Sequence, residues 1–502
     1  MYLEKIIENW YWLMPEIYLI IMVVSLLAYG VIYGASTEGR YSQLKKITWL
    51  SIITLILTSF IVMYLYSQLD GRIEIAGIIG IDKFNLFVKE IVLFSGAAVL
   101  LLSLDSYTQE NIKEFEYTQL VLLSILGMLI LVSSQDLIIL YLAIELISLS
   151  LYTLAAIKRD KELSTEAGLK YFIMGALSSG LLLIGCTILY IETGDTNFIA
   201  ISNYVIYSVN PGIELGALMV IIAMLFKLAA APFHMWVPDV YEGSPTIVTG
   251  YFAIVPKIAL LTILINLLFG PFLGIWNNML QAVILGSAIL SIIIASIGGI
   301  NQAMFKRLIG YSAIGHMGFM LLGIGVATFA SIQATLIYAV LYILMSINSF
   351  ACVLCIWRGG ENHISRLCTI SRTSPILAIT FVICLFSIAG IPPLAGFLSK
   401  YLVLLTAVEG KFTILAIIAV LFTCISCFYY LRLIHYIYFQ DKSLYLVRAL
   451  NENVEKKNRS VREISIERSL LLGSTLYVIL TLLIYPQPLL MLSFDCLINS
   501  LY

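Results

Sequence analysis

Charged residues are scarce in this chain of 502 residues: Asp, Glu, Lys and Arg make up 12% of it, against 61% hydrophobic residues. Soluble globular proteins carry about a quarter charged residues, so the composition excludes a soluble enzyme. The mean hydropathy of +0.98 also excludes a disordered chain, because disorder requires low hydrophobicity. The formal net charge is −1, so the chain lacks a basic surplus and we expect no nucleic-acid partner.

The chain also lacks the short motifs of common cofactor and catalytic sites. No GxGxxG, Walker A, HExxH or GxSxG pattern occurs in a suitable setting. Most of the eight cysteines lie inside apolar runs, including the CxxC pairs at 352–355 and 424–427, where cysteine packs as a small apolar residue. We therefore expect no disulfide framework, no metal and no cofactor in this chain.

Long apolar runs are what the sequence does contain. A membrane-spanning helix needs about 20 mostly apolar residues. The first run lacks the basic start and cleavage site of a signal peptide, so we count it as a span. The sequence predicts an all-α polytopic membrane protein with about fourteen transmembrane helices. They lie near 14–35, 46–66, 84–104, 117–134, 137–157, 166–190, 213–236, 244–268, 277–299, 308–327, 331–357, 375–408, 412–431 and 469–491.

Proline interrupts the seventh and the twelfth of these spans, in AAAPFHMWVP (229–238) and IAGIPPLAGF (388–397). Because proline removes a backbone donor and clashes with the preceding turn, both helices should be broken at membrane depth. Broken backbone is tolerated there only inside protein or beside a water-filled cavity. The five-span spacing of the two breaks indicates two structural repeats of five helices, as in many transporters.

The loops divide the basic residues unequally between the two sides of the membrane. One side holds nearly all the Lys and Arg of the loops, whereas the other holds only Lys5, Arg72, Lys83 and Lys411. Basic loops stay inside, so we expect both termini to face outward. The stretch 441–468 is the only long polar segment and is predicted to be a solvated loop on the basic side.

Seven charged residues lie within the apolar runs, although each charge at mid-bilayer costs roughly 2.5–3.5 kcal/mol on insertion scales. They are Lys89, Glu90, Glu145, Lys170, Lys227, Lys257 and Lys400. Lys89 and Glu90 lie near the start of a span, where snorkelling to the interface could satisfy them. The other five are harder to explain by their position alone.

An acid and several lysines in one bundle can pair with one another and hold water. A desolvated lysine releases its proton more readily and a buried glutamate retains one more firmly, so both can exchange protons near neutral pH. Two histidines, His234 in the first break and His316, titrate in the same range and can join such a relay. The sequence therefore predicts a buried proton relay. The alternative is a set of structural ion pairs that fix helix contacts.

Three stretches resemble one family, the antiporter-like subunit 2 of respiratory complex I, called subunit N in bacteria. They are LFKLAAAPFHMWVPDVYEGSPTIVTGYFAIVPKIALL (225–261), KRLIGYSAIGHMGFM (306–320) and FSIAGIPPLAGFLSKYLVL (386–404). The resemblance runs across essentially all fourteen spans. HMWVPDVYEGSPT is specific to subunit 2, whereas GIPPLAGFLSK is shared by the wider antiporter-like group.

The resemblance implies fourteen helices, with helices 4–8 and 9–13 forming two inverted repeats and helices 7 and 12 broken. It divides the chain into an N-terminal three-helix segment (1–116), a first repeat (117–268), a second repeat (277–440) and a C-terminal part (441–502). It also implies a chain without redox centres that moves protons. Partner subunits hold FMN, iron–sulfur clusters and ubiquinone and pass the electrons.

The resemblance assigns roles to four of the buried charges. It implies that Glu145 and Lys227 form the coupling pair, that Lys257 is the central relay and that Lys400 lies on the outlet side. Lys170 and His234 match the lysine of helix 6 and the histidine of the helix-7 break. Two other functions stay open: a stand-alone cation/proton antiporter subunit, and an inert membrane spacer.

The resemblance also implies partners and a location. The partners are the other membrane-arm subunits of complex I, including neighbouring antiporter-like subunits, and membrane lipids. The three N-terminal spans and the stretch FYYLRLIHYIYF (428–439) resemble plant, algal or protist mitochondrial subunits. We therefore expect the mitochondrial inner membrane, with both termini facing the intermembrane space. The alternative is a bacterial plasma membrane.

Overall fold

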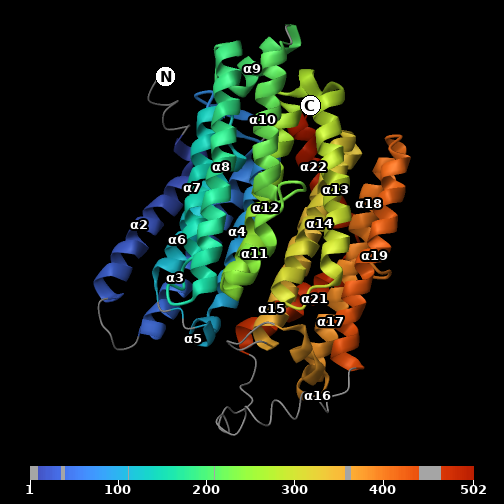
Figure 1. The fold of residues 1–502 in the computed structure, drawn as a ribbon. Coiled ribbons are helices and arrows are strands. Elements are labelled where there is room, and N and C mark those ends of the chain that lie inside the picture. Colours follow the sequence, from blue (N-terminus) through green and yellow to red (C-terminus); the bar gives the residue numbers. More distant parts are fainter. Residues whose placement is uncertain are drawn as a thin grey trace.

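Helices that run along one common axis make up nearly all of the bundle (Figure 1). The structure is a computed structural model and describes residues 10–34, 40–69, 71–110, 112, 114–207, 210–356, 363–439 and 465–501. In a bilayer the backbone finds no water, so apolar segments satisfy their polar groups within helices. The prediction of an all-α polytopic membrane fold is confirmed.

The elements follow one another along the chain from the N-terminal side to the C-terminal side. The first half contains α2 (Met14–Gly34), α3 (Arg40–Gln68), β1 (Ile73–Ile75), β2 (Ile79–Ile81), α4 (Lys83–Ser103), α5 (Ser106–Glu110), α6 (Glu116–Val132), α7 (Leu137–Ala155), α8 (Glu162–Thr193), α9 (Phe198–Tyr207), α10 (Pro211–Leu228), α11 (Trp236–Gly243) and α12 (Thr246–Phe269). The second half contains η1 (Leu273–Ile275), η2 (Trp276–Leu280), α13 (Gln281–Ile300), α14 (Phe305–Val326), α15 (Phe329–Ile356), η3 (Ile364–Thr369), α16 (Ile370–Thr373), α17 (Pro375–Ala389), α18 (Ala395–Glu409), α19 (Thr413–Tyr438), α21 (Ile466–Ile484) and α22 (Gln487–Leu501). The two strands pair antiparallel, with Ile73 opposite Ile81.

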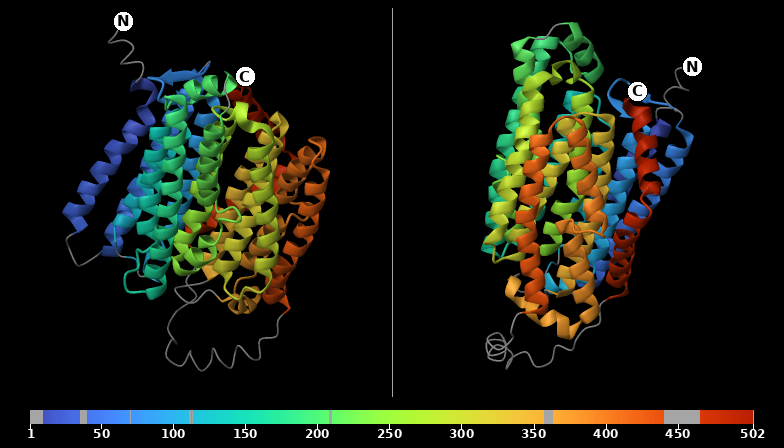
Figure 2. Two further views of the ribbon diagram at one scale, coloured as in Figure 1. Left: turned by 45° about the horizontal axis from the view of Figure 1, so that its top comes forward. Right: turned by 90° about the vertical axis from the view of Figure 1, so that its right-hand side faces the viewer.

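Twelve of the described helices are long and apolar enough to span a membrane by themselves. The two remaining predicted spans are present in shorter pieces. The fourth is α6 with 17 residues, and the twelfth is divided between α17 and α18 with 15 residues each. The C-terminal span is α21 followed by α22, which continues toward the same end of the bundle (Figure 2).

Both predicted breaks are present within the helical bundle. The α10 helix ends at Leu228, where Ala229 adopts a left-handed conformation with φ 64°, and α11 begins at Trp236. The α17 helix ends at Ala389, Gly390 has φ 84°, and α18 begins at Ala395. Figure 1 shows that α10–α11 and α17–α18 run in opposite directions along the bundle axis, which is the relation expected between inverted repeats.

Burial separates a central helix from peripheral ones. The best apolar window of α12 is 89% buried inside the protein, whereas those of α19 and α21 are each 22% buried. Large apolar side chains on the outer helices are exposed, such as Ile32 on α2 and Ile191 on α8. An exterior of this kind faces lipid or other membrane subunits. The α12 helix, which carries Lys257, therefore lies at the centre.

Lys89 does not snorkel to the interface. It is 1% exposed, and its Nζ lies 2.5 Å from Oε1 of Glu16 on α2. The expectation from the sequence was wrong for this lysine because a counter-charge from another helix meets it inside the protein. The neighbouring Glu90 takes no part in this ion pair, and its Oε2 is buried without a hydrogen bond to a described residue.

Arg468 joins the start of α21 to the ends of α4 and α15. It lies at the start of α21, is 4% exposed, and donates from Nη2 to the carbonyl of Leu102 (3.2 Å) and to Ser106 Oγ. Its Nη1 donates to the carbonyl of Leu354 on α15 (3.4 Å). One guanidinium thus satisfies carbonyl groups at the ends of α4 and α15. Most of the predicted loop at 441–468 lies outside the described residues.

The two ends of the bundle differ in structure and in charge: one carries the β-hairpin and the other carries basic turns. The hairpin of β1 and β2 lies at one end, here called the hairpin end, together with the end of α22 (Figure 2). The turns that join α7 to α8 and α13 to α14 lie at the other end, here called the basic end. Lys158, Lys161, Lys306 and Arg307 belong to or flank these turns.

Candidate functional site

Glu145 lies in the middle of α7, an apolar helix that begins at Leu137, directly after Asp136. The Asp136 carboxylate accepts a hydrogen bond from the amide of Ile138 (2.7 Å) and so caps the helix. Oε2 of Glu145 accepts a hydrogen bond from Ser148 Oγ at 3.2 Å. Oε1 is buried and makes no hydrogen bond with a described residue. The carboxylate is therefore only partly satisfied by its own helix.

Lys227 lies in the last turn of α10, directly before the first break. Its Nζ donates a hydrogen bond to the hydroxyl of Tyr152 at 3.1 Å. Among the described residues Lys227 forms no ion pair, so the predicted direct pair with Glu145 is not closed in this structure. The two residues belong to neighbouring parts of the same site, because Ser148 lies beside both.

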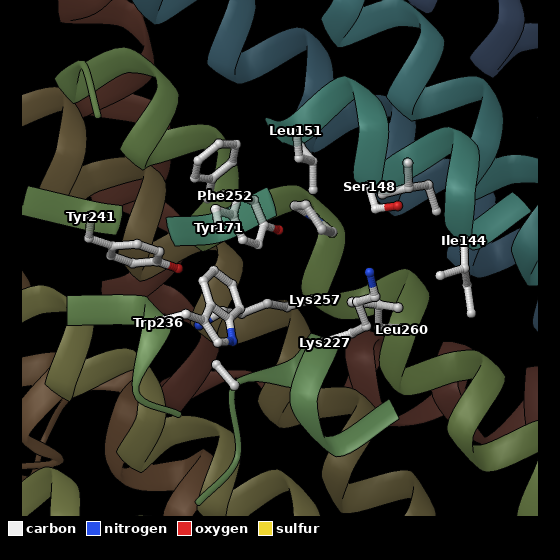
Figure 3. A pocket seen from close by; sticks show the side chains of 13 residues that line it. Ile144, Ser148, Leu151, Tyr171, Lys227, Trp236, Tyr241, Phe252, Lys257 and Leu260 are labelled. Carbon is white, nitrogen blue, oxygen red and sulfur yellow. The ribbon is translucent and has the colours of Figure 1, made fainter. Parts of the chain in front are cut away.

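A small cavity of about 30 Å³ separates Lys227 from Lys257. Figure 3 shows Ser148 and Lys227 on one side of it and Trp236 and Tyr241 on the other. A space of this size holds about two water molecules. The first break brings α11 close enough for Trp236 to line the cavity, and the Trp236 indole N–H donates to the carbonyl of Phe226 (3.1 Å).

Lys257 lies in the centre of α12, directly after Pro256, and is 6% exposed. Its Nζ donates a hydrogen bond to the Tyr342 hydroxyl on α15 at 3.2 Å and lies 5.2 Å from the centre of that ring. No carboxylate forms an ion pair with Lys257 among the described residues. The ammonium group of Lys257 is therefore stabilised by a neutral hydroxyl and by the face of an aromatic ring.

His316 on α14 continues the row of polar groups. Its ring lies 5.1 Å from the ring of Tyr342, and Nδ1 is 2.8 Å from the Tyr338 hydroxyl. Two cavities of about 20 Å³ each adjoin His316, and each has room for about one water molecule. One of them is lined by Tyr342 and the other by Lys400, so His316 lies between these two side chains.

Lys400 on α18 closes the row beside the second break. It is 8% exposed and donates to the carbonyl of Ala389, the last residue of α17, at 2.8 Å. The end of a helix attracts a positive charge, which stabilises the lysine there. A Cβ atom at Gly390 would lie 2.8 Å from Cδ of Lys400, so glycine leaves the space that the lysine occupies.

These contacts define one continuous row, here called the buried lysine line. It runs from Lys227 through a cavity to Lys257, then through Tyr342 and His316 to Lys400. The structure thus brings together four of the residues singled out from the sequence, and Glu145 lies beside its first member. Charged and polar groups in this arrangement can hold water and pass protons.

Lys170 and His234 lie beside this line. Lys170 is 45% exposed and forms ion pairs with Glu166 (2.7 Å) and Asp239 (3.2 Å). His234 is buried within the first break, and its Nδ1 makes no hydrogen bond with a described residue. Neither side chain lines the three cavities of the line. Their part in the relay stays a prediction.

A charged cluster at the basic end fixes α11 and the start of α12. Oε1 of Glu110 accepts from the amide of Thr246 and Oε2 from Lys158 Nζ, both at 3.0 Å. Burial lowers the pKa of Lys158, although the nearby Glu110 carboxylate opposes this change. Lys306 Nζ donates to the carbonyls of Glu242 and Ser244. The cluster therefore holds the segment that carries Trp236 and Lys257.

The hydroxyl groups of the site were not singled out from the sequence. Ser148 and Tyr152 follow Glu145 by three and seven residues, so all three share a face of α7, and this spacing was a usable signal. Tyr342 carries no such signal, because it is one of 30 tyrosines and its contact with Lys257 joins distant helices.

Metal ligands do not cluster in the part of the chain that the structure describes: no group of three or more His, Cys, Asp or Glu could hold a metal ion there. The eight cysteines are free, and both CxxC pairs lie on helices, Cys352 and Cys355 on α15 and Cys424 and Cys427 on α19.

A polytopic helical bundle with two oppositely directed broken helices and buried lysines beside them defines an antiporter-like membrane protein. Residues 134–426 match the transmembrane family model described as NADH:quinone oxidoreductase/Mrp antiporter. The chain is 39% identical to NADH-ubiquinone oxidoreductase chain 2 of Marchantia polymorpha, over 95% of this chain and 96% of that relative. It belongs to the family of NADH–quinone oxidoreductase chain 2, or subunit N.

A second relative agrees with this membership, and a solved structure agrees with the fold. NADH-quinone oxidoreductase subunit N of Rhodobacter capsulatus is 38% identical, over 86% of this chain and 89% of the relative. A chain in the structure of respiratory complex I from Thermus thermophilus with bound aureothin has the same fold, with a TM-score of 0.76 and 24% identity. That likeness covers 95% of this chain and 98% of the other.

Proposed function

We propose that this chain is a proton-translocating subunit of the membrane arm of NADH:ubiquinone oxidoreductase and that the buried lysine line is its proton path. Membership in the chain 2 family supports the complex, since the curated relatives carry that name. One observation supports the path above all: Lys227, Lys257, His316 and Lys400 follow one another, joined by water-sized cavities and by the Tyr342 hydroxyl.

The mechanism begins at Glu145 and Lys227. Reduction of quinone in a partner subunit changes the conformation or charge at the neighbour of this chain, and the Glu145–Lys227 pair closes or opens in response. A lysine without its counter-ion holds its proton less firmly in an interior of low dielectric constant. Lys227 then passes its proton through the water of the adjoining cavity toward Lys257.

The second half of the path carries the proton from Lys257 to the outlet side. The Tyr342 hydroxyl accepts the hydrogen bond from Lys257, and the adjoining cavity links this hydroxyl to His316. A second cavity links His316 to Lys400. Histidine can bind a proton at one nitrogen and release one from the other, so it suits the position between two lysines.

Other subunits complete the proposed assembly. Electron transfer takes place in partners that hold FMN, iron–sulfur clusters and ubiquinone, and this chain needs none of them for its own step. The exposed apolar residues of the outer helices fit neighbouring antiporter-like subunits and lipid acyl chains. The proposed repeats are 117–268 and 277–440, with 1–116 and 441–502 packed beside them.

The proposed location is the mitochondrial inner membrane. The basic end faces the matrix and the hairpin end faces the intermembrane space, because basic loops remain on the side from which a chain is inserted. Both termini then face the intermembrane space.

Two measurements test the function. Purification of the native assembly should yield this chain together with rotenone-sensitive NADH:quinone reductase activity. Replacement of Lys227 by Ala should then reduce NADH-driven proton pumping by about a hundredfold or more, roughly the effect of removing a positioned proton-transfer group, while the amount of assembled complex stays unchanged.

Each outcome separates this proposal from its rivals. A chain that purifies alone, without that activity, and exchanges cations for protons would be a stand-alone antiporter. Apolar replacements at Glu145 and Lys257 that leave pumping intact would make the chain an inert spacer. Normal pumping by the Lys227→Ala complex would count against the buried lysine line.

A further inference from the structure

Lys227 has a partner other than Glu145 in this structure. Its Nζ donates to the Tyr152 hydroxyl at 3.1 Å and lies 5.6 Å from the centre of the Tyr152 ring. Tyr152 is 6% exposed, so water does not compete freely for its hydroxyl. The lysine is therefore held by a neutral acceptor rather than left without a partner.

The two alternative partners of Lys227 lie on the same face of α7. Tyr152 follows Glu145 by seven residues, which is about two helical turns. Ser148 lies between them, donates to Oε2 of Glu145 at 3.2 Å and lines the same cavity as Lys227. One face of α7 thus carries the neutral hydroxyl that Lys227 contacts and, about two turns away, the carboxylate of Glu145.

The α8 helix fixes Tyr152 in this position. The rings of Tyr171 and Phe172 meet the Tyr152 ring edge-on, with centres 4.7 and 5.7 Å away. The Tyr152 hydroxyl fits against Gly175, where an added Cβ atom would lie 1.9 Å from the hydroxyl oxygen. Glycine at position 175 therefore provides the space in which this hydroxyl meets Lys227.

We propose that Tyr152 is a positioning residue that holds Lys227 apart from Glu145, so that Lys227 alternates between a hydroxyl-bound and a carboxylate-bound position. The proposal rests on the proposed function, in which opening of the Glu145–Lys227 pair drives the proton toward Lys257. It adds the group that stabilises the open position. Without that group the closed ion pair is favoured, because an unpartnered ammonium is costly in the interior.

Three variants of the intact complex test this role. Tyr152→Phe removes the hydroxyl and keeps the ring packing, whereas Gly175→Ala displaces the hydroxyl and keeps the tyrosine. Gly180→Ala is the matched control on the same helix, because nothing lies within 4 Å of the added Cβ atom. The first two variants should lose about three- to tenfold in NADH-driven proton pumping, and the control should pump at the wild-type rate.

The position of the lysine separates this role from a merely structural one. In the cryo-EM structure of the Tyr152→Phe complex, Lys227 Nζ should lie in ion-pair contact with Glu145, with the ring of residue 152 in place. Wild-type pumping by both test variants, or a lysine that stays apart from Glu145 in the Tyr152→Phe complex, would overturn the proposal.

The Lys227→Ala complex shows which claim has failed. If that variant does not pump while Tyr152→Phe and Gly175→Ala both pump normally, the proposed function stands and the role of Tyr152 is refuted. If Lys227→Ala itself pumps normally, the failure lies in the proposed function.

Discussion

Single buried charges carry most of the functional signal in this chain. Glu145, Lys227, Lys257 and Lys400 were identified from hydropathy alone, because each interrupts an apolar run in which a charge is costly. Their partners were not predictable in the same way. Lys257 meets Tyr342, and Lys89 meets Glu16, through contacts between helices far apart in the sequence.

Asp82 provides a pH-dependent test at the hairpin end, outside the membrane spans. It is 6% exposed and lines a cavity of about 510 Å³. Burial raises the pKa of Asp82 to about 6, although Arg72 at 3.7 Å opposes this change. The folded chain therefore binds this proton more tightly than the unfolded chain. The resulting stability is complete at acidic pH and is lost as the pH rises through about 6.

Replacement of Asp82 by Asn should stabilise the chain at pH 8 by on the order of 1–2 kcal/mol and have little effect near pH 4, close to the ordinary pKa of 3.8. Thermal denaturation of the purified complex at both values measures the difference. Asp105→Asn is a control for which the opposite change in stability is expected. Burial raises the pKa of Asp105, but contacts with Ser465, Arg468 and Lys45 outweigh this effect and lower it overall. That variant should melt at a lower temperature above pH 5. An Asp82→Asn complex that is stabilised as much at pH 4 as at pH 8 would contradict the sign.

At the scale of elements, the order of the helices and both breaks were predictable, because apolar length and proline act locally. The exact ends were not. The seventh span was expected to reach residue 236, but α10 ends at Leu228, since Ala229 takes a left-handed conformation that alanine rarely adopts. The expected solvated loop at 441–468 also extends too far, because α21 begins at Ile466 and Arg468 is buried against α4 and α15.

Close contact between α8 and α10 depends on small residues, as in many membrane helix pairs. A Cβ atom at Gly185 would lie 2.9 Å from the carbonyl oxygen of Gly216 and 3.0 Å from the amide of Val220. Gly185→Val should therefore separate the helices and destabilise the chain by about 1–3 kcal/mol. The amount of assembled complex and its melting temperature measure this loss.

Gly180→Val is the control for that prediction, because Gly180 lies on the same helix with open space around it. Equal losses in the two variants would mean that valine disturbs α8 itself rather than its contact with α10.

At the scale of the whole molecule, the unequal distribution of basic residues predicts how the chain is oriented. Lys161 lies exposed at the basic end, and Glu409 lies exposed at the end of α18, on the other side. Cysteine introduced at position 161 should react with a membrane-impermeant maleimide only from the matrix side. Cysteine introduced at position 409 should react only from the intermembrane-space side.

Intact mitoplasts and inverted inner-membrane vesicles provide the two accessible faces for this measurement. The parent chain is the control, because Cys424 is exposed and sets the background. Labelling of both positions from one face would contradict the predicted orientation and the odd number of crossings predicted between residues 161 and 409.

The contact of Arg468 with the ends of α4 and α15 also has a consequence for biosynthesis. A ribosome inserts helices in order, so the contact between Arg468 and the carbonyl of Leu102 cannot form until more than 360 further residues have been made. Until then α4 and α15 lack the guanidinium that joins their ends. A nascent chain truncated before α21 should therefore be recognised as incomplete and degraded, even though most of its crossings are already in the bilayer.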